Sequence, residues 1–385
     1  MKEPYKRGNV WYIKYDEPRG PDGKRRQRTL ACKGMNQKQA KQKLRDILTS
    51  IHQDAYVDPA SMQFSDYLRK WLDSAKDKLA PQTHERYVEM AERHVIPALG
   101  GLRLDRIKPM HIQDYCSKAL KTGRLDGKGG LAPKTVKNTL GMIHAALTQA
   151  VKWQLLSQNP ADSVDPPRVR RKEIRTATNA DIAKLFDVIE GSKYKMPIFI
   201  ILATGVRRGE AVGLKWDDFD SERRTLTVRR SLSQVKDGVV EKETKTDRAR
   251  VVMIPEMLVS DLKAHRQEQE RRKQILGEQY KDEGWICAGL HGERMAPKWL
   301  GNQFTRLARS VGVNITLHGL RHTQATALIM AGVPVKVVSE RLGHSTVAIT
   351  QDIYAHVMPH MQQRAAEVME GILRANKKQE KQEEE

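Results

Sequence analysis

The chain has 385 residues, of which 68 are Lys or Arg and 47 are Asp or Glu, so its formal charge at neutral pH is +21. This length suits two or three domains, and the excess of positive charge predicts a polyanionic partner, with nucleic acid as the first candidate. No apolar run approaches the roughly 20 residues of a membrane span, and no basic amphipathic anchor stands out, so a membrane partner is disfavoured.

Cysteine usage and the N-terminus favour a cytoplasmic protein. Residues 1–11 lack the apolar core of a secretory signal peptide. Cys32, Cys116 and Cys287 are far apart and odd in number, so they cannot form a disulfide framework. No CxxC pair is present, and Cys287 with His291 is only half of a metal site. We expect the cysteines to be small buried or half-buried hydrophobic residues, and we expect no metal.

Residues 1–55 predict a small β-sheet followed by one helix. Two β-like runs, residues 10–15 and 27–32, flank a segment rich in Gly and Pro, which is typical of a turn. Asn36 is a plausible N-cap for a helix with an apolar stripe over residues 40–51.

The same segment is rich in basic residues, among them Arg25, Arg26 and Arg28. One interpretation is that these residues only keep a solvent-exposed hairpin soluble. The reading we favour is a sheet laid into a DNA groove, with cations on phosphates and a few side chains on base edges.

A linker at residues 55–62 precedes a predicted helical bundle. Apolar stripes and helix-opening prolines mark four helices, which begin near Gln63, Gln82, Pro109 and Pro133. We expect the second to end at Ile96, before Pro97. Four such helices form a compact bundle. Basic residues outside the stripes include Lys134 and Lys137, and the net charge favours DNA contact for them over simple solvation.

Three prolines and a basic end predict an extended linker over residues 159–171. The next and largest domain mixes helices and strands. Its predicted elements are a helix capped by Thr178 or Asn179, an apolar helix-like run at 197–213 broken by TGVRRGE, strands at 225–230 and 249–254 with a turn-rich segment between them, a charged helix at 256–276, and further helices to a low-complexity tail.

Cleaving a phosphodiester needs a nucleophile, positive charge for the non-bridging oxygens and a proton for the leaving oxygen. Divalent metals held by carboxylates supply one route, and fixed cations with a protein nucleophile supply another. The acidic residues of KWDDFD lie at a turn, where Asp is favoured for local backbone bonding, so a metal site there is disfavoured.

The cationic route is well supplied by this sequence. Arg207 lies in a break between apolar helices, and Arg321 shares a helix face with His318 three residues earlier. Each guanidinium can grip phosphate oxygens bidentately. Lys245 precedes a strand, and Tyr354, ten residues after His344, is the candidate nucleophile. Each motif alone is weak, but the ordered set in one domain is specific.

These motifs resemble those of the tyrosine recombinase (phage-type integrase) family. The resemblance lies in TGVRRGEAVGLKW, the ETKTDRARVVMIP hairpin, LHGLRHTQATALIMAG, ERLGHST and DIYAH. It covers the whole chain in outline and is most specific in residues 176–365. Residues 1–55 resemble the arm-type DNA-binding domain of such integrases, and residues 63–160 resemble their core-binding domain.

The resemblance implies a role for each motif residue. Tyr354 attacks the scissile phosphate and stays joined to the 3′ end, while Lys245 protonates the leaving 5′ oxygen. Arg207 and Arg321 stabilise the transition state. The full expected catalytic set is Arg207, Lys245, His318, Arg321, His344 and Tyr354, in which His318 helps take the tyrosine proton, His344 hydrogen-bonds the phosphate, and Glu210 orients the site. No cofactor or metal is implied, because the covalent link stores the bond energy.

Several of these assignments have alternatives. Arg208 could bind the phosphate in place of Arg207, and Glu210 could pair with a surface cation. His322 is expected to pack or to face solvent. The amphipathic residues 358–377 either pack within the chain or, as the family resemblance suggests, dock on a neighbouring protomer.

The expected fold class is multidomain and mainly α with small β-sheets. The predicted domains are an arm-type DNA-binding domain at residues 1–55, a helical core-binding domain at 63–160, a linker at 161–175, an α+β catalytic domain at 176–365, and a C-terminal helix end with a disordered charged tail at 366–385.

The predicted function is site-specific DNA recombination that integrates and excises a phage or mobile element. Alternatives are an Xer-like chromosome or plasmid dimer resolvase, which lacks an arm-binding domain, and a non-catalytic DNA-binding regulator. Expected partners are double-stranded attachment-site DNA with core and arm-type sequences, three further protomers in a homotetramer, a directionality factor and a host DNA-bending protein. The expected location is the nucleoid in the bacterial cytoplasm.

Overall fold

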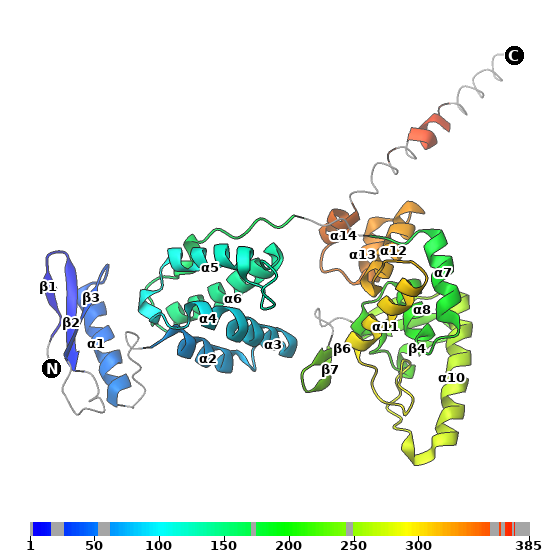
Figure 1. Ribbon diagram of the computed structural model, residues 1–385, viewed down its shortest axis with the longest axis horizontal. Coiled ribbons are helices and arrows are strands. Elements are labelled where there is room, and N and C mark those ends of the chain that lie inside the picture. The colour runs from blue at the N-terminus through cyan, green and yellow to red at the C-terminus, as the bar shows by residue number, and fades with distance from the viewer. Residues whose placement is uncertain are drawn as a thin grey trace. The chain divides into compact units, whose positions relative to one another are not determined.

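The computed structural model describes residues 3–16, 27–52, 62–170, 175–243, 249–354, 362, 366–371 and 373. The chain divides into two compact units, Met1–Val169 and Arg170–Glu385 (Figure 1). The described residues are mainly helical with small antiparallel sheets, which agrees with the predicted fold class. No helix among them is long and apolar enough to span a membrane.

The first unit begins with a three-stranded antiparallel sheet, in the order β1 (Tyr5–Arg7), β2 (Val10–Asp16), β3 (Gln27–Cys32). The helix α1 (Gln37–His52) packs on β2, and the two bury a small apolar core of their own. Asn36 caps α1 as predicted, because its Oδ1 accepts from the backbone N of Gln39 at 2.9 Å. The strand β1 was not predicted, since three residues are too few to show an alternating pattern.

The predicted helices of residues 63–160 are present as α2 (Phe64–Ala75), α3 (Pro81–Met90), α5 (Pro109–Thr122) and α6 (Pro133–Lys152). Their apolar faces enclose one core that includes Phe64, Leu68, Ile112 and Ile143. The hydroxyl of Tyr67 donates to the backbone oxygen of Ala146 at 2.5 Å, which ties α2 to α6.

The predicted end of the second helix at Ile96 is wrong. The chain continues from α3 through a π-helical turn, η1 (Ala91–Val95), into α4 (Ile96–Leu99), which contains Pro97. Proline lacks a backbone N–H and crowds the preceding turn. A π-helical turn widens the helix next to this disturbance, so the chain passes the proline and ends at Gly100 instead.

Residues 159–164 also differ from the extended track that was predicted. They form a short 3₁₀ turn, η3 (Pro160–Ser163), in which Asn159 Oδ1 accepts from the backbone N of Ala161 at 2.9 Å. Ala161 and Val164 are buried in the bundle core. The prolines exclude a regular helix, but the small apolar residues between them still add to the core.

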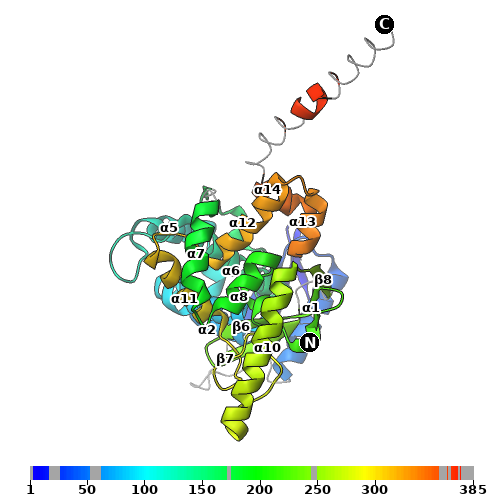
Figure 2. The same ribbon diagram turned by 90° about the vertical axis from the view of Figure 1, so that its right-hand side faces the viewer.

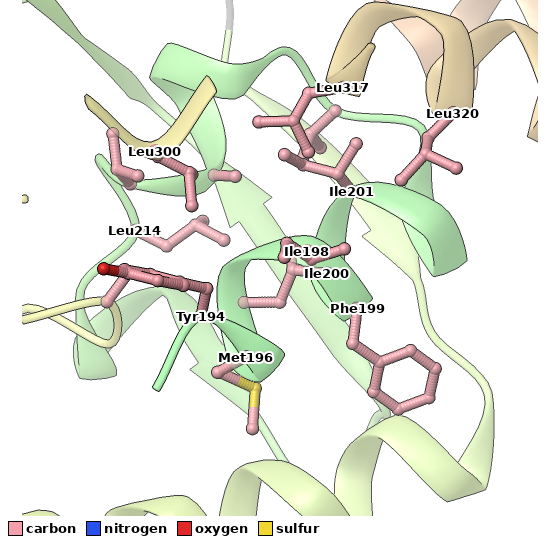
Figure 3. Close-up of a cluster of buried hydrophobic side chains, with 14 of the residues drawn as sticks. Tyr194, Met196, Ile198, Phe199, Ile200, Ile201, Leu214, Leu300, Leu317 and Leu320 are labelled. Carbon is pink, nitrogen blue, oxygen red and sulfur yellow. The ribbon is translucent and has the colours of Figure 1, made fainter. Parts of the chain in front are cut away.

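The second unit is organised around α8 (Lys195–Thr204), which is apolar on nearly all sides. Its neighbours include α7 (Asn179–Glu190), α10 (Glu256–Leu276) and α12 (Leu317–Met330), and α11 (Pro297–Ser310) packs on α7 and α12 (Figure 2). Ile198, Ile200 and Ile201 point into the core, close to Leu317 and Leu320 of α12 (Figure 3). The N-cap of α7 is Thr178, one of the two predicted residues.

Two small sheets complete this unit. One has the order β4 (Phe219–Asp220), β5 (Thr225–Val228), β8 (Arg250–Met253). The other is a hairpin of β6 (Arg230–Val235) and β7 (Gly238–Glu243), in part of the segment that was predicted as turn-rich only. Its strands carry many polar residues, which hid the β pattern. All three cysteines are free and buried, as predicted.

Candidate active site

The first part of the site lies where α8 ends. Gly205 adopts φ +71 and stops the helix, and the short helix α9 (Arg208–Ala211) starts with Arg207 as its N-cap residue. Glu210 folds back on Arg207: its Oε2 accepts from the backbone N and its Oε1 from Nη1, both at 2.8 Å. The carboxylate of Glu210 is buried, whereas 46% of the Arg207 side chain is exposed. Glu210 thus fixes one side of Arg207, and the rest of the Arg207 side chain is accessible to solvent.

Arg321, on α12, is almost fully buried. Its Nη1 donates to the backbone oxygen of Gly205, and its Nη2 donates to that of Leu342 at 2.8 Å. One guanidinium therefore joins the end of α8 to the end of α13 (Val335–Leu342). A buried charge needs such partners, because their absence would leave its desolvation uncompensated.

The LGH motif brings Arg207 and Arg321 together. Gly343 ends α13 at φ +66, and its carbonyl accepts from Arg207 Nη2 at 2.8 Å. Arg207 and Arg321 are therefore bonded to adjacent carbonyls, those of Gly343 and Leu342. The last carbonyls of a helix have no partner within it and carry its negative dipole end, so guanidiniums are well placed there.

His344 and His318 lie beside these arginines. Nδ1 of His344 shares a hydrogen bond of 2.8 Å with the hydroxyl of Thr350. Burial, then the charges of Arg321 and Arg207, lower the pKa of His344 to about 4. Burial and the charges of Arg321, Arg207 and Arg208 also lower the pKa of His318. Both imidazoles are neutral at neutral pH, and a neutral ring can accept a proton or a hydrogen bond.

His322 packs against His318, as predicted, with the ring centroids 4.5 Å apart. It is buried, and this burial, followed by the charges of His318 and Arg321, lowers its pKa to about 4. Arg208 turns toward α11: a Cβ at Gly301 would meet Arg208 Nη1 at 2.3 Å. Burial lowers the pKa of Arg208.

Two predicted catalytic side chains lie outside the described part of the structure. Lys245 lies in the undescribed stretch between β7 and β8. Tyr354 is the last residue of α14 (Val347–Tyr354), and its side chain lies outside the described part of the structure. The structure thus brings together Arg207, Glu210, His318, Arg321 and His344.

The predicted DNA contacts of the first unit are described only in part. Lys134 and Lys137 are exposed in the first turns of α6. Arg25 and Arg26 lie outside the described residues, as does the side chain of Arg28. In KWDDFD, Asp218 Oδ2 accepts from Arg230 Nη1 at 2.6 Å, so this carboxylate is already paired. Among the described residues, no three His, Cys, Asp or Glu gather as a metal site.

One member of the site was missed from the sequence. Arg250, the first residue of β8, donates through Nη2 to Glu210 Oε2 at 2.5 Å and through Nη1 to Oε1 at 3.2 Å. Strand alternation places it on the same face as buried Val252. Since Val251 and Met253 are also apolar, the alternation of this strand does not indicate which face is buried.

The arrangement is suited to an oxyanion with several oxygens. Two guanidiniums are fixed by backbone carbonyls, neutral imidazoles lie beside them, and the surrounding chain is strongly basic. Such forks bind phosphate oxygens with defined geometry. The fold is multidomain and mainly helical, and the charge and geometry of the site suit a phosphate group.

Comparison with known proteins gives the family. Residues 175–361 match the phage integrase family, and residues 63–120 match the N-terminal SAM-like domain of phage integrases. A tyrosine recombinase XerC-like protein of Caldanaerobacter subterraneus subsp. tengcongensis is 30% identical, over 88% of this chain and 90% of that protein. The chain belongs to the phage integrase family of tyrosine recombinases.

Solved structures agree with this fold. The Tn1549 transposon integrase in complex with a circular intermediate DNA has a TM-score of 0.65 at 21% identity, over 79% of this chain and 100% of that one. A lambda integrase tetramer bound to a Holliday junction has a TM-score of 0.53 at 18% identity, over 90% and 96%. The solved structures confirm the predicted fold class. The family match and the 30% identical relative confirm the predicted family and enzyme class, a tyrosine recombinase.

Proposed function

We propose that this recombinase is an integrase that inserts and excises a mobile element through a covalent 3′-phosphotyrosyl intermediate. The observation that carries the proposal is the pairing of Arg207 and Arg321 on the adjacent carbonyls of Gly343 and Leu342. These two carbonyls directly precede His344, and the chain continues from His344 into α14, which ends at Tyr354. The two guanidiniums that would bind the phosphate are therefore bonded to the segment that leads to the proposed nucleophile.

In the proposed reaction the Tyr354 oxygen attacks phosphorus, and the bond to the 5′ oxygen breaks. Neutral His318 takes the tyrosine proton, and Lys245 donates a proton to the departing 5′ oxygen. A free tyrosine has a pKa of about 10, so nearby positive charge is needed to favour the phenolate. Arg207, Arg321 and His344 stabilise the charge on the non-bridging oxygens. A 5′ hydroxyl from a second duplex reverses the steps.

Replacing Tyr354 with phenylalanine tests this chemistry. We expect the wild-type chain to form a covalent adduct with a nicked duplex that carries the inverted repeats beside its own gene, and Tyr354→Phe to form none, because the attacking oxygen is gone. A denaturing gel of the end-labelled duplex measures the adduct, and DNA binding before denaturation is the control. Absence of the wild-type adduct, or an adduct of equal yield in the variant, would contradict the proposal.

The small sheet of residues 3–52 favours integration over dimer resolution. It has its own core, and the family resemblance implies that Xer-like dimer resolvases lack such an arm-binding domain. We therefore propose that this sheet binds arm-type sites, that Lys134 and Lys137 contact the core site, and that four protomers assemble on DNA.

Deleting residues 1–55 separates integration from dimer resolution. We expect core-site cleavage to persist, because Arg207 and Arg321 lie in the other unit, while recombination between two attachment sites on plasmids is lost. Cleavage of the nicked core duplex serves as the control for folding. Undiminished recombination by the truncated chain would favour the resolvase alternative.

A further inference from the structure

We infer that Arg250 is a positioning residue of the strand-cleavage reaction, which fixes Arg207 through the carboxylate of Glu210. The inference rests on the proposed function and extends it to a residue that was not among the predicted catalytic residues. Arg250 is assigned a positioning role because its Nε, Nη1 and Nη2 already donate to the Arg341 carbonyl and to Glu210.

Arg250, Glu210 and Arg207 form a chain of hydrogen-bonded ion pairs. Arg250 donates to both oxygens of Glu210, at 3.2 and 2.5 Å. The same two oxygens accept from the backbone N and from Nη1 of Arg207, both at 2.8 Å. The Glu210 carboxylate is 3% exposed, so water cannot replace either partner easily. The orientation of Arg207 therefore depends on a carboxylate that Arg250 holds in place.

Arg250 is also part of a second pattern at the end of α13. Its Nε donates to the Arg341 carbonyl at 3.2 Å, while Arg321 and Arg207 donate to the next two carbonyls, those of Leu342 and Gly343. Three guanidiniums thus hold three successive carbonyls of the segment that leads to His344. Arg250 is the only one of the three that also bonds the Glu210 carboxylate bidentately within the described residues.

The charge of Arg250 determines the protonation of Glu210. Burial alone would raise the pKa of Glu210, but the hydrogen bonds and charge of Arg250, followed by those of Arg207, outweigh burial and lower it. An ionised carboxylate accepts on both oxygens, whereas a protonated one turns one oxygen into a donor. Without Arg250, the pKa of Glu210 rises and the bonds to Arg207 are lost at a higher pH than in the wild type.

The test compares Arg250→Gln with wild type in single-turnover cleavage of the nicked attachment-site duplex across a pH series. At neutral pH we expect the rate to fall about 10- to 100-fold, because misplacing a catalytic group by about 1 Å costs on the order of 10²-fold. The acid side of the rate profile should shift to higher pH. Arg250→Lys, which keeps the charge, should return the acid side toward the wild-type position.

Arg230→Gln is the matched control. Arg230 is 19% exposed and pairs with the fully buried carboxylate of Asp218 at 2.6 Å. The other partners of these two side chains are Glu241, Arg229 and the backbone N of Lys215. This variant should lose stability in thermal unfolding while its pH profile keeps the wild-type acid side. If Arg250→Gln keeps the wild-type rate, or behaves as Arg230→Gln does, Arg250 is a structural ion pair and the inference is overturned.

A double-mutant cycle tests the route through Glu210 and guards against misfolding. Glu210→Gln with Arg250→Gln leaves no uncompensated charge between the two positions, and we expect its rate to match that of Glu210→Gln alone, since contacting residues are not additive. If the losses of cleavage rate in the two single variants add up in the double variant, Arg250 does not act through Glu210 and the inference is overturned. If the wild type forms no covalent product, the proposed function fails and the inference with it; an active wild type with additive variants removes the inference alone.

Discussion

Replacing Arg321 with alanine is expected to reduce strand cleavage by about 10²- to 10³-fold, the usual cost of removing one fixed charge-stabilising donor from a transition state. It should also destabilise the fold. The substitution leaves the carbonyls of Gly205 and Leu342 without this donor inside the protein, at about 1–3 kcal/mol for each unsatisfied group. Single-turnover cleavage and urea unfolding measure the two effects separately.

Arg341→Ala is the matched control for this prediction. Arg341 likewise bridges two backbone carbonyls, since its Nη1 donates to Met253 at 2.9 Å and its Nη2 to Ala203 at 2.8 Å. Its guanidinium holds α13 in place by these two bonds, and neither acceptor is a residue of the predicted catalytic set. We expect comparable destabilisation with a much smaller loss of cleavage. Equal losses of cleavage in the two variants would show that Arg321 acts only through the fold.

Arg321→Lys separates charge from geometry. A lysine ammonium is a single point charge, whereas the planar fork of arginine presents several N–H groups in fixed directions. One ammonium cannot reproduce the bridge between the end of α8 and the end of α13. Lysine should therefore recover little of the lost cleavage, and substantial recovery would contradict the bridging role.

Local signals explain which parts of the fold could be predicted. Pro109 and Pro133 open helices because proline fits the first helical turn, and Asn36 and Thr178 cap helices through their own side chains. These effects act over a few residues and are visible in any sequence. The π-helical turn before Pro97 is different, since it depends on how the bundle accommodates the proline.

The candidate site shows the same division. Arg207, His318, Arg321 and His344 were found because each lies in a recognisable motif. The bonds that unite them run to backbone carbonyls far away in sequence, such as Gly205 and Leu342 for Arg321. Carbonyl acceptors have no sequence signature, because every residue supplies one. Arg250 was missed because its partners, the Arg341 carbonyl and the Glu210 carboxylate, lie 91 and 40 residues away in the sequence.

Gly343 is where the site and the fold constrain each other most. Its φ of +66 lies in the left-handed region, and a Cβ built there would stand 2.8 Å from Cζ and from Nη1 of Arg250. Two constraints favour glycine at this position: the left-handed backbone conformation, and the lack of space for a Cβ beside the Arg250 guanidinium. Its carbonyl also accepts from Arg207, so any shift of this residue moves the Arg207 guanidinium.

Gly343→Ala should therefore cost more than backbone strain. We expect a loss of about 1–2 kcal/mol from the left-handed conformation, a further loss from displacement of Arg250, and a fall in cleavage of about 10²-fold as Arg207 loses its position. Gly312→Ala is the control, because Gly312 follows α11 at φ +75 with nothing within 4 Å of a Cβ. Gly312→Ala should therefore lose only the stability due to the left-handed backbone conformation, and it should cleave at the wild-type rate. Urea unfolding and single-turnover cleavage of both variants decide the matter: if they are equally stable and equally active, the guanidinium beside Gly343 does not constrain the site, and the geometry assigned to Arg207 and Arg250 is wrong.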